Sequence, residues 1–208
     1  MQAPKWLRLR REAWGFIVGS ALFIVGAVPA YSAAVGPIVD NVTFFVGSLF
    51  FTLAVVIQLG LTGRRPPRAA TNRPDRFDWW AAAIQFAGTV FFNLSTATAL
   101  LASLAGSDRT GWRPDAYGSV CFLIAGVLAV VATIGRDALW DPHARTWHGT
   151  GLNLLGSIAF AIAAVGAYVL PETGQLFLPN WATVGTIAGG VCFLVAAVLG
   201  RPGTPRLT

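Results

Sequence analysis

Residues 44–56 read FFVGSLFFTLAVV, an apolar run interrupted only by small Gly, Ser and Thr side chains. Within this run, Gly47 and Ser48 precede Phe51, so a glycine and a phenylalanine lie four residues apart. On an α-helix these two positions share one face, a turn from each other, and the helix presents a notch beside a ring. Helices in lipid associate through close packing of small residues. We therefore expect a Phe of a neighbouring helix to fill this notch.

The same spacing occurs six times along the chain, and the glycine is usually followed by Ser or Thr. The six motifs are Gly19-Ser20…Phe23, Gly47-Ser48…Phe51, Gly88-Thr89…Phe92, Gly118-Ser119…Phe122, Gly156-Ser157…Phe160 and Gly189-Gly190…Phe193. The second, fourth and sixth motifs recur at intervals of 71 residues, and the first, third and fifth at intervals of 69 and 68. A constant period of this kind predicts three tandem helical hairpins, copied from one ancestral two-helix unit.

The composition is that of an integral membrane protein, because 55% of the 208 residues are hydrophobic and only 12% are charged. Six stretches are long enough to cross a bilayer as helices: 14–34, 38–62, 79–104, 115–135, 151–171 and 182–200. They are continuously apolar and lack the alternation of membrane β-strands. The predicted fold is all-α, with six transmembrane helices arranged as three hairpins.

This fold divides the chain into five parts: a basic N-terminal segment at 1–13, hairpin repeats at 14–62, 79–135 and 151–200, and a tail at 201–208. Basic residues predict the orientation, since 13 of the 15 Lys and Arg fall before the first span, after the last, or in the two loops on the same side. The opposite loops contain only Arg109 and Arg113. By the positive-inside rule, both termini are cytoplasmic. Attraction to lipid headgroups explains the net charge of +6 without nucleic acid.

Polar residues at membrane depth are the first candidates for function, yet no ionisable residue lies in the central part of any predicted span. This pattern disfavours ion-coupled transport through a midplane carboxylate and predicts that the protein is not an enzyme. The deepest polar group is Asn93, followed by Ser95 and Thr96. These three side chains are interpreted as interhelical hydrogen-bonding groups, with a polar pocket or pore constriction as the alternative.

Asp40, Asp115 and Asn180 stand at the predicted starts of the three returning helices. Asp and Asn accept hydrogen bonds from the free N–H groups of a helix N-terminus, so capping is the first interpretation. The alternative is a cation or substrate site, built where the three related loops meet on the non-cytoplasmic face.

Two further groups of reactive side chains match no specific template. His143 and His148 share a cytoplasmic loop with Asp137 and Asp141, and we interpret it as an interfacial loop of mixed polarity rather than a metal site. Cys121 and Cys192 occupy one repeat position, and we expect them to be reduced and packed. No cofactor and no metal is predicted.

Several segments resemble the YrhK-like family of small bacterial membrane proteins. The first hairpin is most similar, where Arg10-Arg11-Glu12-Ala13-Trp14 leads into Phe16-Ile17-Val18-Gly19-Ser20 and Phe44-Phe45-Val46-Gly47-Ser48 returns. Asp78-Trp79-Trp80, Phe91-Phe92-Asn93-Leu94-Ser95-Thr96 and the passage from Trp112-Arg113-Pro114-Asp115 to Gly118-Ser119 also resemble larger members with repeated units. The resemblance implies a helical fold in the bacterial inner membrane and no catalytic residues, because the family is functionally uncharacterised.

The sequence therefore predicts a non-enzymatic multi-pass protein that acts through helix packing with itself, with lipid or with a membrane partner. The alternative is a channel or facilitator for a small neutral or weakly polar solute, with a path lined by Asn93, Ser95 and Thr96. A third possibility is an enzyme whose chemistry lies in the loop of His143 and His148. A continuous cavity reaching Asn93 favours the facilitator, and a bond from Asn93 to a neighbouring helix favours packing.

Overall fold

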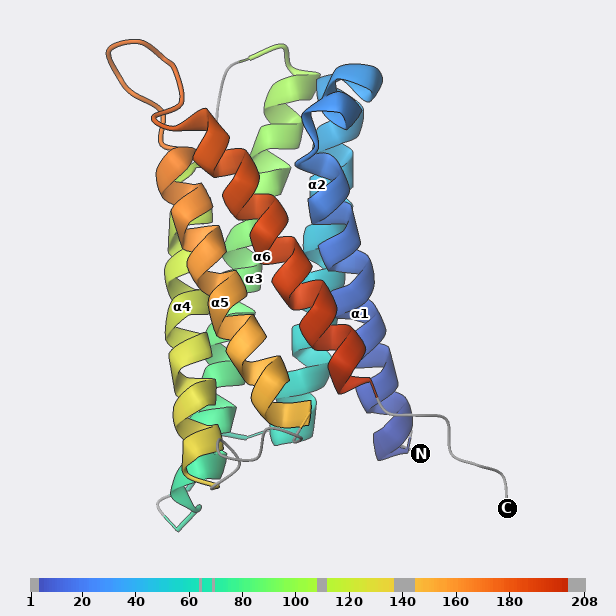
Figure 1. The fold of residues 1–208 in the computed structure, drawn as a ribbon, viewed down its shortest axis with the longest axis vertical. Coiled ribbons are helices and arrows are strands. Elements are labelled where there is room, and N and C mark those ends of the chain that lie inside the picture. The colour runs from blue at the N-terminus through green and yellow to red at the C-terminus, as the bar shows by residue number, and fades with distance from the viewer. Residues whose placement is uncertain (1–3, 64, 69, 108–111, 137–144, 202–208) are drawn as a thin grey trace.

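Six long helices make up the computed structural model, which describes residues 4–63, 65–68, 70–107, 112–136 and 145–201 (Figure 1). The helices are α1 (Lys5–Gly26), α2 (Pro29–Thr62), α3 (Arg73–Leu104), α4 (Trp112–Ile134), α5 (Arg145–Gly166) and α6 (Pro179–Gly200). Apart from an isolated antiparallel bridge between Val169 and Leu176 before α6, the described residues contain no β-structure. The fold is therefore all-α, as predicted.

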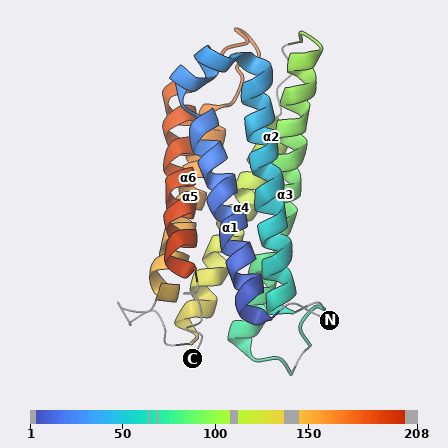
Figure 2. The same cartoon turned by 90° about the vertical axis from the view of Figure 1, so that its right-hand side faces the viewer.

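The six helices form a closed ring in chain order. Each helix packs against its neighbours in the sequence, and α6 returns to pack against α1. Figures 1 and 2 show the helices running roughly along one common axis. At the closure, a β-carbon added to Gly190 of α6 would lie 2.7 Å from Cγ1 of Ile24 and 3.3 Å from the carbonyl oxygen of Ser20, both on α1. The absence of a side chain at Gly190 thus allows the first and last helices to meet.

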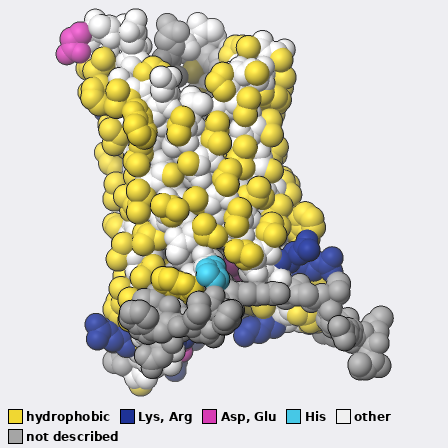
Figure 3. Space-filling model, viewed as in Figure 1, with side chains coloured by type: hydrophobic (Ala, Val, Ile, Leu, Met, Phe, Trp, Pro, Cys, Tyr) yellow, Lys and Arg dark blue, Asp and Glu magenta, His cyan; other side chains and the backbone are white. Residues whose placement is uncertain are grey.

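The distribution of side chains is that of a bundle surrounded by lipid. Branched aliphatic residues face outward, with Leu94 52% and Leu101 65% exposed, and Figure 3 shows apolar side chains along the flank of the bundle. The interior instead holds small residues and Phe, as in helix interfaces within membranes. Five helices, α2 to α6, are long and apolar enough to cross a membrane. Helix α1 is the exception, because Arg8, Arg10, Arg11 and Glu12 occupy its first half.

The first hairpin turns earlier than predicted. The expected first span, 14–34, is not one helix, because α1 ends at Gly26 and α2 already begins at Pro29. Proline lacks an N–H and fixes its φ, so it fits the first turn of α2 and would break the interior of α1. Helix α2 then kinks at Gly36, whose φ of +80° suits glycine, immediately before Pro37. The residues predicted as the end of the first span thus form the opening turns of the second helix.

Both ends of the described chain lie at one end of the bundle, where α1 begins and α6 finishes (Figure 1). We call this the basic end, because Lys and Arg gather there on the face drawn in Figure 3, and the opposite end the far end. Because the number of helices is even and successive helices run antiparallel, the chain finishes at the end of the bundle where it starts.

Candidate functional site

Inside each hairpin, the glycine of one helix faces the Phe of its partner helix. A β-carbon added to Gly19 would lie 2.7 Å from the Phe51 ring, and one added to Gly47 would lie 2.9 Å from the Phe23 ring. The second hairpin repeats this exchange through Gly88 with Phe122 and Gly118 with Phe92, and the third through Gly156 with Phe193 and Gly189 with Phe160, at 2.7–3.0 Å. The structure therefore places a ring of the partner helix in each of the six notches.

The six Phe rings meet at the centre of the bundle and form its hydrophobic core. The motif Phe of the second helices, Phe51, Phe122 and Phe193, lie toward the basic end, and all three pairs of ring centroids are 5.7–6.4 Å apart. The motif Phe of the first helices, Phe23, Phe92 and Phe160, lie toward the far end, with Phe160 6.0 and 6.1 Å from the other two. Pairs within each hairpin join the layers at 5.0–5.6 Å. We call these six rings the aromatic barrier.

A cavity of about 310 Å³ lies on the basic side of the barrier, and we call it the basic-side cavity. Its lining residues are Leu9, Glu12, Ala13, Phe16, Gln58, Gly149, Thr150, Asn153, Phe193, Ala196, Ala197 and Gly200. Its polar groups come from α1, α2 and α5. The Oε1 atom of Gln58 is buried and has no hydrogen-bond partner among the described residues. The cavity thus combines one carboxyl group with amide and hydroxyl groups.

A second cavity, of about 260 Å³, lies on the other side of the barrier, and we call it the far-side cavity. Its lining residues are Phe23, Asn41, Phe44, Phe92, Ser95, Thr96, Ala99, Trp112, Asp115, Phe160, Ala163, Ala167, Leu176, Ala182 and Thr186. All three rings of the far-side layer form its floor. Trp112 is held in its wall by a hydrogen bond from Nε1 to the carbonyl oxygen of Ala164, at 2.7 Å. The two cavities are therefore separated by the aromatic barrier.

The three predicted polar residues of the middle hairpin have different surroundings. Asn93 donates a hydrogen bond from Nδ2 to Oγ1 of Thr52 on α2, at 2.9 Å, and its Oδ1 is buried without a partner among the described residues. The hydroxyls of Thr96 and Ser48 are hydrogen-bonded at 3.0 Å. Ser95 and Thr96 line the far-side cavity, whereas Asn93 does not. Asn93 thus joins α3 to α2, whereas Ser95 and Thr96 face the far-side cavity.

The predicted cluster of helix-start residues is only partly present. Asp115 lines the far-side cavity, but Asp40 and Asn180 do not, and Asn180 is exposed. The kink at Gly36 explains the position of Asp40, because this residue follows the kink within α2 instead of starting a helix. Asn41, the next residue, lines the cavity and donates a hydrogen bond to Oγ of Ser103 at 2.7 Å.

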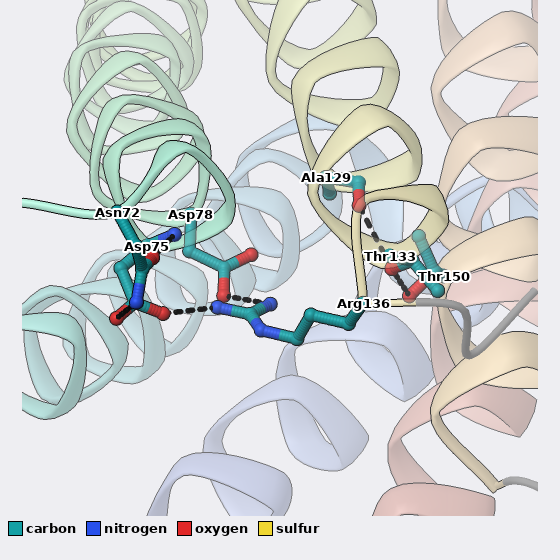
Figure 4. Close-up of polar contacts among 7 residues, drawn as sticks. All are labelled: Asn72, Asp75, Asp78, Ala129, Thr133, Arg136 and Thr150. Atoms are coloured by element: carbon teal, nitrogen blue, oxygen red, sulfur yellow. Dashed lines mark hydrogen bonds and ion pairs between the residues drawn. The ribbon is translucent and has the colours of Figure 1, made fainter.

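An ion-pair cluster at the basic end joins α3 to Arg136, two residues past the end of α4 (Figure 4). The Arg136 guanidinium binds the carboxylates of Asp75 and Asp78, each at 2.5 Å. A helix of 32 residues is longer than the bilayer core, so the first turn of α3 lies outside the hydrocarbon. There, hydrogen bonds from Arg136 and then Asn72 lower the pKa of Asp75. Sequence reasoning used these residues only for orientation and missed the pair, because Arg136 and Asp75 are 61 residues apart.

The remaining candidates either line neither cavity or lie outside the described residues. His143, Asp137 and Asp141 are outside the described residues, while His148 lies on α5 and is exposed. Cys121 and Cys192 are free thiols, half-buried, and each precedes a ring of the barrier. Their β-carbons face Gly88 and Gly156 of the adjacent helix. The two cysteines therefore pack within separate hairpins.

Comparison with protein-family models, curated proteins and solved structures finds no match to this chain.

Proposed function

We propose that this protein is a non-enzymatic, six-span protein of a bacterial inner membrane with both termini in the cytoplasm. The support for a sixth span is the position of α1, which packs between α2 and α6 and closes the ring. Its charged first half lies at the basic end, where long Arg side chains reach the headgroups. The shared exchange of Gly and Phe within all three hairpins supports descent by duplication. The motif resemblance supports the YrhK-like family.

The function that the geometry supports best is facilitated passage of a small solute across the membrane. One observation carries this proposal: cavities lie on opposite sides of the bundle centre, and only two layers of Phe rings separate them. In this proposal, passage requires the Phe rings to change rotamer, because they fill the space between the two cavities. In this account the described conformation is the closed one, and the aromatic barrier is the gate.

Helix packing with a partner, the first interpretation of the sequence, is our second candidate. The exposed aliphatic flank fits such a role, but it fits lipid equally well. All six notches are filled by rings of the same chain, so the motif that suggested association is used inside the bundle. The bond from Asn93 to Thr52 is the outcome that favours packing over a path at Asn93, but it joins two helices of one chain. A role directed at a partner therefore rests on the flank alone, and for this reason we place passage first.

The test is solute uptake by liposomes that contain the purified protein. We expect wild-type protein to accelerate uptake of small polar solutes over protein-free liposomes, measured by light scattering in a stopped-flow instrument. Phe122→Ala opens the basic-side layer, because the Phe122 ring is 1% exposed and contacts both other rings of that layer. We expect this variant to take up solute faster than wild type.

Phe45→Ala is the matched control, because Phe45 is a half-buried Phe of α2 that does not belong to the core cluster. We expect uptake by this variant to equal that of wild type. Phe122→Ala removes a core ring and costs about 3–5 kcal/mol of stability, so circular dichroism must show that it is folded. Uptake equal to protein-free liposomes for wild type and for folded Phe122→Ala would refute passage and favour the packing role.

A further inference from the structure

The described residues that line the far-side cavity are largely aromatic, and one of them is acidic. Its floor is the far-side layer of the barrier, and Phe44 and Trp112 contribute two more aromatic walls. Asp115 is the one carboxylate among the described residues that line the cavity. Aromatic faces are negative at their centres and attract a cation that has lost part of its hydration shell. Both features of the lining therefore favour the same sign of ligand charge.

Asp115 has no compensating charge in the described part of the chain. The only ion pairs there are those of Arg136, at the opposite end of the bundle, and the Asp115 side chain makes no hydrogen bond with a described residue. Arg113 lies two positions away on α4, but its side chain is exposed. A carboxylate removed from bulk water costs free energy unless a cation or a hydrogen-bond donor accompanies it. Among the described residues, the cavity thus has no counter-ion for Asp115.

The position of Asp115 in the repeat shows that it is not required by the fold. Relative to the motif glycines, Asp115 corresponds to Phe44 in the first hairpin and Thr186 in the third, and both also line the cavity. The same site of the bundle therefore accepts a ring, a hydroxyl or a carboxylate. The negative charge is specific to the middle hairpin, which is the behaviour of a ligand group rather than a packing group.

The lining residues also indicate that the cation is organic and not a metal ion. Calcium and magnesium require about six to eight oxygen ligands in close array, whereas this lining is mostly rings and alanine methyl groups. A volume of about 260 Å³ suits a small organic ion rather than a drug-sized molecule. We propose that the far-side cavity binds a small alkylammonium or quaternary ammonium ion, with Asp115 as its counter-ion and the aromatic rings as its walls.

This site names the solute class for the proposed passage and so rests on that proposal for its role, although binding can be measured without transport. The basic-side cavity adds support, because it also carries a carboxyl group, that of Glu12, beside Gln58 and Asn153. A cation that crosses the barrier would thus meet one acidic residue on each side.

The test is calorimetric titration of the purified full chain in detergent with choline, with sodium at equal ionic strength in every cell. The matched ligand is 3,3-dimethylbutan-1-ol, which has the shape of choline with a neutral carbon in place of the nitrogen. We expect saturable binding of choline and at least about tenfold weaker binding of the alcohol, equivalent to about 1.4 kcal/mol. Equal binding of the two ligands, or no saturable binding of choline, would overturn the proposal.

Two variants locate the site. Asp115→Asn keeps the side-chain shape and removes the charge, and we expect it to weaken choline binding at least about tenfold. Asp40→Asn is the control, because Asp40 precedes the cavity residue Asn41 in α2 and does not itself line the cavity. We expect it to bind like wild type. Equal losses in both variants would overturn the assignment of Asp115. If Asp115→Asn does not fold, the comparison of choline with the neutral alcohol still decides the proposal.

Failure of this inference and failure of the proposed function give different results. Choline binding without any uptake in liposomes would refute passage and leave the site. Uptake of neutral solutes without choline binding would refute the cation site and leave passage.

Discussion

At the scale of single residues, the six motif glycines let two helices approach until a ring occupies the space of a missing β-carbon. Not every helical glycine of this chain is packed in this way. Gly19 faces a ring at 2.7 Å and a backbone carbonyl oxygen at 3.0 Å, whereas Gly151 on α5 has no heavy atom within 4 Å of an added β-carbon. The sequence spacing predicted contacts of this kind, because a face of a helix follows directly from its periodicity.

We expect Gly19→Ala to lower the free energy of unfolding by about 1–3 kcal/mol, because the added methyl group overpacks the contact with Phe51 and Gly47. Gly151→Ala is the control, and we expect it to be neutral or to stabilise α5 by up to about 1 kcal/mol, since Ala is the better helix former. Unfolding of both variants by denaturant in detergent micelles, followed by circular dichroism, measures the difference. Equal stability of the two variants would contradict the role of the notch.

The cavity around Asp115 could not be predicted from the residue itself. Its type and position led to two interpretations, a helix cap and part of a cation site, but its cavity is formed by residues from all of the hairpins. No local sequence pattern predicts that residues from three hairpins line one cavity. The sequence did not indicate that Glu12 lines a cavity, because Glu12 lies in a basic segment whose charge is explained by attraction to lipid headgroups.

At the scale of helices, the contact between α2 and α3 is polar along much of its length. Asn93 bonds Thr52, Thr96 bonds Ser48, and Asn41 bonds Ser103. The sequence predicted interhelical bonding by Asn93 but not its partner, because a helix face does not identify the helix that packs against it. Equally, hydropathy predicted the apolar run of the first hairpin but placed its turn too late, because apolar and small residues continue past Pro29, where α2 begins.

We expect a double-mutant cycle of Asn93→Ala and Thr52→Ala to give a coupling of about 0.6–1.7 kcal/mol, the range found for hydrogen bonds between membrane helices. The reason is the bond from Asn93 Nδ2 to Thr52 Oγ1. Both single variants and the double variant are measured by denaturant unfolding in micelles. A coupling of zero would show that Asn93 does not act through Thr52, and would reopen a role for Asn93 in a solute path.

At the scale of the whole molecule, three hairpins surround an aromatic barrier and leave a cavity on each side. The number of helices and their hairpin order follow from length, hydropathy and repeat spacing, all of which are local properties of the chain. Closure into a ring does not, because duplication is equally compatible with hairpins stacked in a row. It depends on the contact of α6 with α1, between residues more than 160 positions apart in the sequence.

Ring closure is the central claim, because without it the six rings would not meet and neither cavity would exist. The direct measurement is intramolecular disulfide formation in the membrane between Ile24→Cys and Gly190→Cys, in a chain whose Cys121 and Cys192 are replaced by Ala. Cγ1 of Ile24 lies 2.7 Å from the β-carbon position of residue 190, which places the two side chains within reach of a disulfide. Val191, the adjacent residue, is 42% exposed on the flank. The closed ring predicts rapid oxidation of the 24–190 pair, seen as a mobility shift that reductant reverses, and little oxidation of Ile24→Cys with Val191→Cys. Absence of the 24–190 cross-link, or equal cross-linking of both pairs, would contradict the closed ring.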